Sequence, residues 1–556
     1  MSESTFPFGE AEDPRGDLRF RTIPDLLSWA SESYGEAEAL VDGDLRLSFT
    51  ELAHEVDRCA RGLLATGIEA GDRVAIWAPN CAEWVIGALG ALRAGASIVT
   101  LNTRYKASEA AYVLNRSRAR VLLSVRGFLG LDFPATLAGE DLPALERLVI
   151  LRGEAEGASP ASAISLEDLL SLGDAVAPMR SIERAASIEP DAICDLVFTS
   201  GTTGNPKGAM TTHAQTLRTF ATWASIVGLA PGDRYLVVNP FFHTFGYKAG
   251  LLASLMAGAT VIPEPVFDVD AVLATIERES VSVLPGPPTL YQSILARDDI
   301  DFSKLASLRL AVTGAAVVPV ELVIAMREKL SFKTVLTAYG LTESCGVVTM
   351  CRPSDKPETI ATTSGRAIPD LEVRIVDLEG NECPRGEAGE VVVRGYAVMP
   401  GYFEDAEATA ETIDAGGWLH TGDVATMDED GNLVITDRIK DMFVTGGFNA
   451  YPAEIEACLR QHPGIGAIAV IGMPDERMGE LGLAVVVPAR EASNALASEI
   501  LGFAREQMAN FKVPRAVAFV QELPVNASGK VLKRVLREQF AKGELPALDA
   551  RGEQVR

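Results

Sequence analysis

The sequence predicts an α/β fold: a large N-terminal domain built from parallel-sheet αβ subdomains and a small β-subdomain, followed by a small α+β C-terminal domain. Up to about residue 365, short apolar and β-branched runs alternate with amphipathic helical patterns. Such alternation is typical of buried parallel strands connected by helices. Beyond that point the strands become short and are separated by turn signals, and a compact α+β pattern begins near residue 442.

The strands of the N-terminal domain are predicted from runs rich in Val, Ile and Leu. These runs are "RVAIWAP" (73–79), "ASIVTL" (96–101), "ARVLLSV" (119–125), "DLVFTS" (195–200), "RYLVVNP" (234–240), "VSVLPG" (281–286) and "LRLAVTG" (308–314). A helix is predicted over 268–280, where apolar residues recur at helical spacing. The small β-subdomain is predicted from 371–377, 389–395 and 432–437, which are separated by turn sequences such as "DEDGN".

The charged segment "DRIKD" marks the predicted domain boundary. We expect an N-terminal domain over 1–436, a hinge at 437–441 and a C-terminal domain over 442–556. The C-terminal pattern comprises a helix from about residue 453, strands at 465–472 and 483–489, a helix from about residue 494 and a strand at 516–520.

Composition excludes several classes of function. The 556 residues include 50 Lys and Arg against 76 Asp and Glu, a net charge of −26, which argues against nucleic acid or an anionic membrane as the main partner. The seven cysteines are scattered and form no C-x-x-C, so neither a disulfide framework nor a zinc site is expected. With no signal-peptide pattern and no apolar run long enough to span a membrane, the sequence predicts a cytoplasmic protein without a transmembrane segment.

The decapeptide "TSGTTGNPKG" (199–208) has the composition of a phosphate-binding loop. Its glycines let main-chain N–H groups approach an anion, and its hydroxyls and Lys207 add donors. Because no Gly-Lys-Ser/Thr run follows, a kinase or GTPase loop is disfavoured. A dehydrogenase is also disfavoured, since no strand–GxGxxG–helix pattern with a following acid stands out.

This loop resembles the first signature of the adenylate-forming enzymes, which include acyl-CoA synthetases, luciferases and peptide-synthetase adenylation domains. Further segments resemble the other signatures in the same order: "TGAA" (313–316), "YGLTES" (339–344), "GWLHTGD" (417–423), "DRIKD" (437–441) and "VNASGK" (525–530). The resemblance implies an ATP-dependent acid–CoA ligase that uses ATP, Mg²⁺ and coenzyme A and has a mobile C-terminal domain. Its partners would be ATP, coenzyme A and a small-molecule carboxylic acid, and a homodimer is a possible assembly.

The resemblance also implies roles for individual residues. Thr342, Glu343, His243 and Lys530 would be catalytic, with Glu343 holding Mg²⁺ and Lys530 as the catalytic lysine. Asp437 would be the hinge pivot. The residues expected to bind ATP or AMP are Thr199, Ser200, Gly201, Thr202, Thr203, Gly204, Lys207, Gly314, Ala315, Ala316, Tyr339, Asp423, Ile435 and Arg438. Those expected along the coenzyme A channel are Lys440, Gly446 and Gly447.

The segment "NPFFHTFGYKAG" (239–250) resembles the part of the family that borders the acyl pocket. His243 would border and gate this pocket. The other residues expected to line it are Phe245, Ala249, Ala338, Gly346 and Val347. Lys248 interrupts the apolar pattern and has two interpretations, a contact to an oxygenated substrate or a side chain that points to solvent, of which the second is favoured.

A closer resemblance concerns the substrate. Several segments, among them "NPFFHTFGYKAG" and "GGFNAYPAEIE", are similar to the actinobacterial CoA ligases of steroid breakdown. This implies that the acid is the propionate side chain of a methylhexahydroindanedione (HIP), the remnant of the steroid C and D rings. The alternatives are a medium- or long-chain fatty acid–CoA ligase, a luciferase-like or carrier-protein adenylating enzyme and, from another class, a non-catalytic nucleotide-binding protein.

Overall fold

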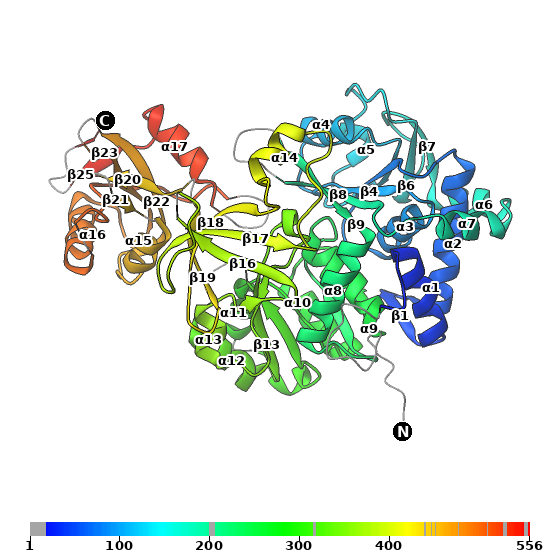
Figure 1. Ribbon diagram of the computed structural model, residues 1–556, viewed down its shortest axis with the longest axis horizontal. Coiled ribbons are helices and arrows are strands. Elements are labelled where there is room, and N and C mark those ends of the chain that lie inside the picture. The colour runs from blue at the N-terminus through cyan, green and yellow to red at the C-terminus, as the bar shows by residue number, and fades with distance from the viewer. Residues whose placement is uncertain are drawn as a thin grey trace. The chain divides into compact units, whose positions relative to one another are not determined.

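The computed structural model divides the chain into two units (Figure 1). The first comprises residues 1–373, 393–419 and 430–433, and the second 374–392, 420–429 and 434–556. The structure describes residues 18–199, 206–297, 299–314, 318–377, 379–438, 441–445, 448–450, 452–475, 478–508, 510–525, 531–549 and 554–555, of which 437, 438, 444, 448, 449 and 555 are described by their backbone alone. Within these residues, no helix is both long and apolar enough to cross a membrane.

A seven-stranded sheet dominates the N-terminal half of the first unit. Its strand order is β7–β6–β5–β3–β4–β8–β9, and every neighbouring pair is parallel except β8 and β9. This confirms the predicted α/β fold with buried parallel strands. The strand bounds are β3 Arg73–Trp77, β4 Ser97–Thr100, β5 Val121–Val125, β6 Arg147–Arg152, β7 Ser162–Ser165, β8 Ile193–Thr199 and β9 Lys207–Thr212.

Two four-stranded sheets follow in the first unit, with the orders β10–β11–β1–β2 and β12–β13–β14–β15. Their bounds are β1 Glu38–Asp42, β2 Leu45–Ser48, β10 Arg234–Val237, β11 Thr260–Pro263, β12 Leu310–Thr313, β13 Thr334–Tyr339, β14 Thr349–Met350 and β15 Arg366–Ala367. The strand predicted at 281–286 is wrong, because only Val283 pairs, through isolated bridges to Tyr235 and Leu310. The segment still lies against β12, because Leu284 and Gly286 donate to the Leu310 and Val312 carbonyls, each at 3.0 Å. Pro285 has no N–H to donate, so the pairing with β10 does not continue beyond Val283.

Helices pack around these sheets. The predicted helix at 268–280 is confirmed as α10, and α8 begins with a capping box in which Thr212 and Gln215 exchange backbone and side-chain hydrogen bonds. The helices of the first unit are α1 Ile23–Tyr34, α2 Phe49–Ala65, α3 Ala82–Arg93, α4 Ala107–Ser117, α5 Phe133–Thr136, α6 Leu166–Asp174, α7 Pro178–Ala186, α8 His213–Val227, α9 Ala253–Ala257, α10 Val269–Glu279, α11 Pro288–Leu295, α12 Val320–Lys329, α13 Pro357–Thr362 and α14 Ala406–Thr412. A π-helix, η1, spans Phe245–Leu252, and 3₁₀ turns span Phe302–Leu305 (η2) and Thr342–Ser344 (η3).

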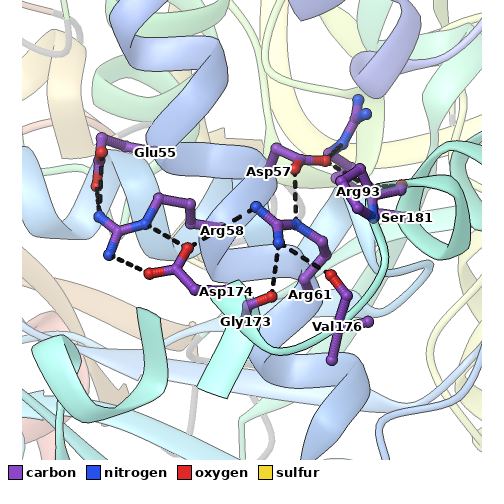
Figure 2. Close-up of polar contacts among 10 residues, drawn as sticks. Glu55, Asp57, Arg58, Arg61, Arg93, Gly173, Asp174, Val176 and Ser181 are labelled. Atoms are coloured by element: carbon purple, nitrogen blue, oxygen red, sulfur yellow. Dashed lines mark hydrogen bonds and ion pairs between the residues drawn. The ribbon is translucent and has the colours of Figure 1, made fainter. Parts of the chain in front are cut away.

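A polar network holds α2 against α6, α7 and α3 (Figure 2). The Arg61 guanidinium donates to the Gly173 carbonyl at 2.7 Å, to the Val176 carbonyl at 3.0 Å and to Asp57 at 2.8 Å. Asp57 also accepts from Arg93 at 3.2 Å and from the Ser181 hydroxyl. A Cβ at Gly173 would lie 2.1 Å from the Arg58 carbonyl oxygen, so the backbones of α2 and α6 approach more closely than any other residue there would allow.

The small β-subdomain predicted after residue 365 is confirmed as a sheet of order β16–β17–β18–β19, whose strands contribute residues to both units. Its strands are β16 Leu371–Val376, β17 Gly389–Gly395, β18 Leu419–Met427 and β19 Leu433–Arg438.

The second unit contains the compact α+β pattern. Along β22, Ile468 and Val470 pack with α15 and α16 on one face, whereas Ala469 and Ile471 pack with Leu536 of α17 on the other. The elements are β20 Phe443–Thr445, β21 Phe448–Ala450, α15 Pro452–Leu459, β22 Ile465–Asp475, β23 Gly479–Pro488, α16 Asn494–Gln507, β24 Ala516–Phe519, α17 Lys533–Ala541, β25 Ala547–Asp549 and β26 Gln554–Val555.

Candidate active site

The predicted phosphate loop joins two antiparallel strands of the first unit. β8 ends at Thr199, β9 begins at Lys207, and these two residues are paired in register. Of the residues expected in the loop, Ser200, Gly201, Thr202, Thr203 and Gly204 lie outside the described residues. The Lys207 ammonium lies 5.3 Å from the centre of the Tyr402 ring, a distance at which the two attract.

Glu343 lies beside the end of β8. Its Oε1 accepts a hydrogen bond from the Thr199 hydroxyl at 3.2 Å and another from the Tyr402 hydroxyl at 2.9 Å. Its backbone oxygen accepts from Met399 at 2.9 Å. Burial and the Glu343 carboxylate raise the pKa of Tyr402, so the phenol remains a donor. The structure thus brings the first residue of the loop and the predicted magnesium ligand together, through segments far apart in the sequence.

Tyr402 was not identified from the sequence. It lies in "PGYFE", a loop that gave no chemical signal of its own. The segment reaches the site because Ala209 of β9 pairs with Tyr402, and Met210 donates to Gly401 at 3.1 Å.

The predicted adenine and phosphate residues of the first unit lie around the ends of β12 and β13. These strands are parallel, and a Cβ at Gly314, just after β12, would lie 3.1 Å from the Ala338 carbonyl of β13. Ligands in α/β proteins bind at such carboxyl ends of strands. Tyr339 ends β13, and Thr342 and Glu343 lie on η3 immediately beyond. Ala315 and Ala316 lie outside the described residues.

The predicted acyl segment (239–250) enters a π-helix at Phe245, a form that is frequent at functional sites. His243 is exposed just before it, and its Nδ1 accepts from the Phe245 backbone N–H at 3.2 Å. The neutral ring therefore carries its proton on Nε2. At Gly246 a Cβ would lie 2.2 Å from the Pro240 carbonyl oxygen, so the start of η1 is pressed directly onto the preceding backbone.

Gly346 connects the signature at 339–344 with this acyl segment. A Cβ there would lie 3.2 Å from the Thr244 Cβ and 3.3 Å from the Phe220 ring, and the φ of Gly346 is +106°. Ala249 and Val347 are buried, whereas Phe245 and Ala338 are partly exposed. Thr244 and Phe220 thus join Gly346 as neighbours that the sequence did not single out.

The favoured interpretation of Lys248 is wrong. Its side chain is fully buried, and its Nζ lies 3.0 Å from Asp195 Oδ2 and donates to the Thr211 hydroxyl at 2.7 Å. Burial lowers the pKa of this ammonium, but the Asp195 carboxylate, with smaller contributions from Cys345 and Cys194, raises it overall. A signal existed in the sequence: one acid in the apolar run "CDLVFT" and one base in an apolar helix require partners when buried.

The remaining predicted residues belong to the second unit. Asp423 of β18 is 4% exposed, and its N–H donates to the Thr421 hydroxyl at 3.1 Å. Ile435 lies on β19 and is partly exposed, and Asp437 and Arg438 end that strand. Lys440, Gly446, Gly447 and Lys530 lie outside the described residues. The strands beside the two glycines, β20 and β21, are paired antiparallel.

Comparison with known proteins finds matches to the AMP-binding enzyme family over most of the chain. Residues 27–403 match the family of the AMP-binding enzyme, and residues 454–530 match the AMP-binding enzyme C-terminal domain. The chain is 49% identical to the 3-[(3aS,4S,7aS)-7a-methyl-1,5-dioxo-octahydro-1H-inden-4-yl]propanoyl:CoA ligase of Rhodococcus jostii (93% of this chain, 98% of the relative). It is 48% identical to the ligase of the same name from Mycobacterium tuberculosis (93% and 99%).

A solved structure has the same fold. The anthranilate CoA ligase AuaEII in complex with anthranoyl-AMP superposes with a TM-score of 0.82 at 30% identity, over 94% of this chain and 98% of that one.

Proposed function

The chain belongs to the AMP-binding enzyme family and is an AMP-forming acid–CoA ligase, and from that premise we propose that its acid is the propionate side chain of a methyl-substituted bicyclic diketone from steroid breakdown. The proposal is supported by relatives of 49% and 48% identity over nearly their whole length that carry this acid in their names. We further propose that it acts in the cytoplasm with Mg²⁺.

The main support for placing the reaction at this site is the hydrogen bond from the Thr199 hydroxyl to Glu343 Oε1, at 3.2 Å. Thr199 begins the loop proposed to hold the leaving phosphates, and Glu343 is the carboxylate proposed to hold the metal. Mg²⁺ in nucleotide sites is commonly bound by one or two carboxylates together with substrate phosphates, so a single partly exposed carboxylate beside a phosphate loop fits it. When bound, Mg²⁺ would neutralise phosphate charge.

In the first step a carboxylate oxygen of the acid attacks the α-phosphorus of ATP. The bond from that phosphorus to the bridging oxygen breaks, and pyrophosphate leaves with that oxygen. Two like charges about 4 Å apart repel by roughly 4 kcal/mol at an effective dielectric of 20, so the site needs cations and N–H donors between the reactants. Lys207 would face the leaving phosphates, and Lys530 would bridge the carboxylate and the α-phosphate.

In the second step the sulfur of coenzyme A attacks the acyl carbon. The bond from that carbon to the phosphate oxygen breaks, AMP leaves, and the thiol proton passes to solvent. We assign Lys440, Gly446 and Gly447 to the channel for the pantetheine arm, because glycines permit close passage along the backbone. We keep Asp437 as the hinge and Asp423, Ile435 and Arg438 as nucleotide contacts.

A panel of acids tests the substrate. AMP release with ATP, Mg²⁺ and coenzyme A is measured for the bicyclic propionate, for a medium-chain and a long-chain straight acid, and for a propionate on a ring system lacking both ketones. The bicyclic diketone should have the highest kcat/KM. If a straight-chain acid exceeds it, the chain is a fatty acid–CoA ligase and the steroid assignment fails. Without coenzyme A, pyrophosphate release should stop after about one turnover, since the adenylate remains bound.

A further inference from the structure

Lys248, Asp195 and Thr211 form a closed ionic cluster in the interior of the first unit. Asp195 lies on β8, Thr211 on β9 and Lys248 on η1, and none of the three side chains is more than 1% exposed. The Lys248 ammonium contacts Asp195 Oδ2 at 3.0 Å and the Thr211 hydroxyl at 2.7 Å, and that hydroxyl donates to Asp195 Oδ1 at 2.7 Å. The third direction of the ammonium meets Cys345 Sγ at 3.7 Å. With these three partners, Lys248 has no N–H left for a substrate.

Net stability alone is a poor reason for such a pair. Removing two charges from water is costly, and apolar side chains of similar volume often stabilise a core as well or better. Losing one partner is severe, however, because the remaining charge is then buried without compensation. The pair therefore strongly resists any shift that separates the segments carrying its members.

Those segments are the ones that carry the reaction. Asp195 precedes Thr199 on β8, Thr211 follows Lys207 on β9, and Asp195 and Thr211 are paired in register. Lys248 lies on the helix that bears Phe245 and Ala249 of the proposed acyl pocket. Cys345 lies in the same segment as Glu343 and Gly346. One buried cluster thus joins the hairpin of the phosphate loop, the acyl helix and the segment proposed to hold the metal.

We propose that Lys248, Asp195 and Thr211 are positioning residues that hold the acyl helix in register with the phosphate-loop hairpin, so that the acid carboxylate and the α-phosphate of ATP are aligned for adenylation. The inference rests on the proposed placement of the acid and ATP but not on the identity of the acid. The cluster does not touch the reactants, and its effect passes through η1, β8 and β9. It should therefore matter for the first half-reaction and much less for the second.

The test compares the two half-reactions in the full-length enzyme. Adenylation is followed as pyrophosphate release at saturating ATP, using whichever acid of the panel the wild-type enzyme turns over best. Thioester formation is followed from the pre-made acyl-adenylate and coenzyme A. Each rate is divided by the concentration of active sites, which is measured from the burst of pyrophosphate released in a single turnover without coenzyme A. A smaller fraction of folded enzyme in a variant therefore does not lower its measured rate.

Two variants perturb the cluster to different degrees. Thr211→Val keeps the shape and removes only the bridging hydroxyl, whereas Lys248→Met removes the cation. Because a misplacement of about 1 Å can cost about 100-fold in rate, we expect kcat for adenylation to fall up to about 100-fold in Lys248→Met and about tenfold in Thr211→Val. The KM for ATP and the rate of thioester formation should stay near those of the wild type.

The double variant Lys248→Met/Asp195→Leu separates positioning from folding. It replaces the pair by apolar side chains, so the melting temperature should return to or above the wild-type value. Adenylation should remain low, because in this proposal the charge pair, and not apolar packing, sets the register of η1 against β8 and β9. If adenylation recovers together with the melting temperature, the pair acts only through stability and the proposal is overturned.

Arg61→Met is the matched control. It removes another buried cation of the same unit, whose partners are drawn in Figure 2 and which contacts none of the proposed site residues that the structure describes. Its melting temperature should fall while the ratio of the two half-reaction rates stays at the wild-type value. An equal change of that ratio in Arg61→Met and Lys248→Met would also overturn the proposal. A wild-type enzyme that adenylates no acid of the panel would instead refute the proposed function.

Discussion

The hydroxyl of Tyr402 is a small perturbation with a specific expected effect. Tyr402→Phe removes the donor that lies 2.9 Å from Glu343 Oε1 and leaves the ring beneath Lys207 in place. A hydrogen bond to a charged acceptor contributes about 1.5–3 kcal/mol. Because Glu343 is partly exposed, water can replace part of the lost interaction, and the lower end of that range applies. At about 1.4 kcal/mol per tenfold, the expected change is about tenfold.

The change should appear in the dependence on Mg²⁺. Among the described residues, the Thr199 hydroxyl at 3.2 Å then remains as the side-chain donor to the Glu343 carboxylate, which is less firmly oriented. The Mg²⁺ concentration at half-maximal pyrophosphate release should therefore rise about tenfold, with the KM for the acid little changed.

Tyr291→Phe is the matched control for this prediction. It removes a buried hydroxyl of the same unit that donates to the Leu284 carbonyl at 2.7 Å, away from the site residues. It should lower the melting temperature and leave the Mg²⁺ dependence alone. If Tyr402→Phe behaves in the same way, the hydroxyl has only a packing role and the reasoning is refuted.

Three further predictions concern other parts of the first unit and the catalytic lysine. Burial lowers the pKa of His213 to about 4 from its ordinary value of 6.5, so the folded state keeps the ring neutral while the unfolded chain binds a proton below about pH 6.5. Stability from this ring is present above pH 6.5 and is lost as pH falls toward 4, by about 3 kcal/mol in all. The free energy of unfolding of His213→Gln, measured by denaturant titration across this pH range, should not show this loss. An identical pH dependence of stability in both proteins would contradict the prediction. Gly346→Val should raise the KM for a bicyclic acid more than for a short straight acid, because its side chain would displace Thr244; equal effects on both acids would remove Gly346 from the pocket. Lys530→Ala should suppress pyrophosphate release by at least about 100-fold while binding of ATP, measured by calorimetry, persists, and near-normal release would refute its assignment.

Local sequence patterns predicted most of the elements because periodicity and turn chemistry act over few residues. The run at 119–125 became β5, and the periodic segment at 268–280 became α10 with Asp268 as its cap. The segment at 281–286 forms only isolated bridges at Val283 because Pro285 removes the next donor toward β10, although Leu284 and Gly286 still donate to β12.

The candidate site was predictable where a signature is continuous in the sequence. Thr199 and Glu343 were each assigned from their own motif, and their contact could be found only in the folded chain. Tyr402 was missed because a single sequence does not show which distant segments meet. For Lys248, the lone acid in "CDLVFT" indicated that a buried partner was needed, but not that the two residues meet. The domain boundary and hinge at 437–441 remain predictions.

The burial of Lys248 in an ion pair has a chemical consequence for an enzyme that forms a reactive acyl-adenylate. An acyl-adenylate reacts with free amines, and a neutral lysine on the acyl helix would compete with coenzyme A for the acyl group. Lys248 is fully buried, and its ammonium is held protonated by Asp195, so it has neither a lone pair nor a path to the intermediate. The helix that borders the proposed acyl pocket thereby carries a lysine that is protected from self-modification.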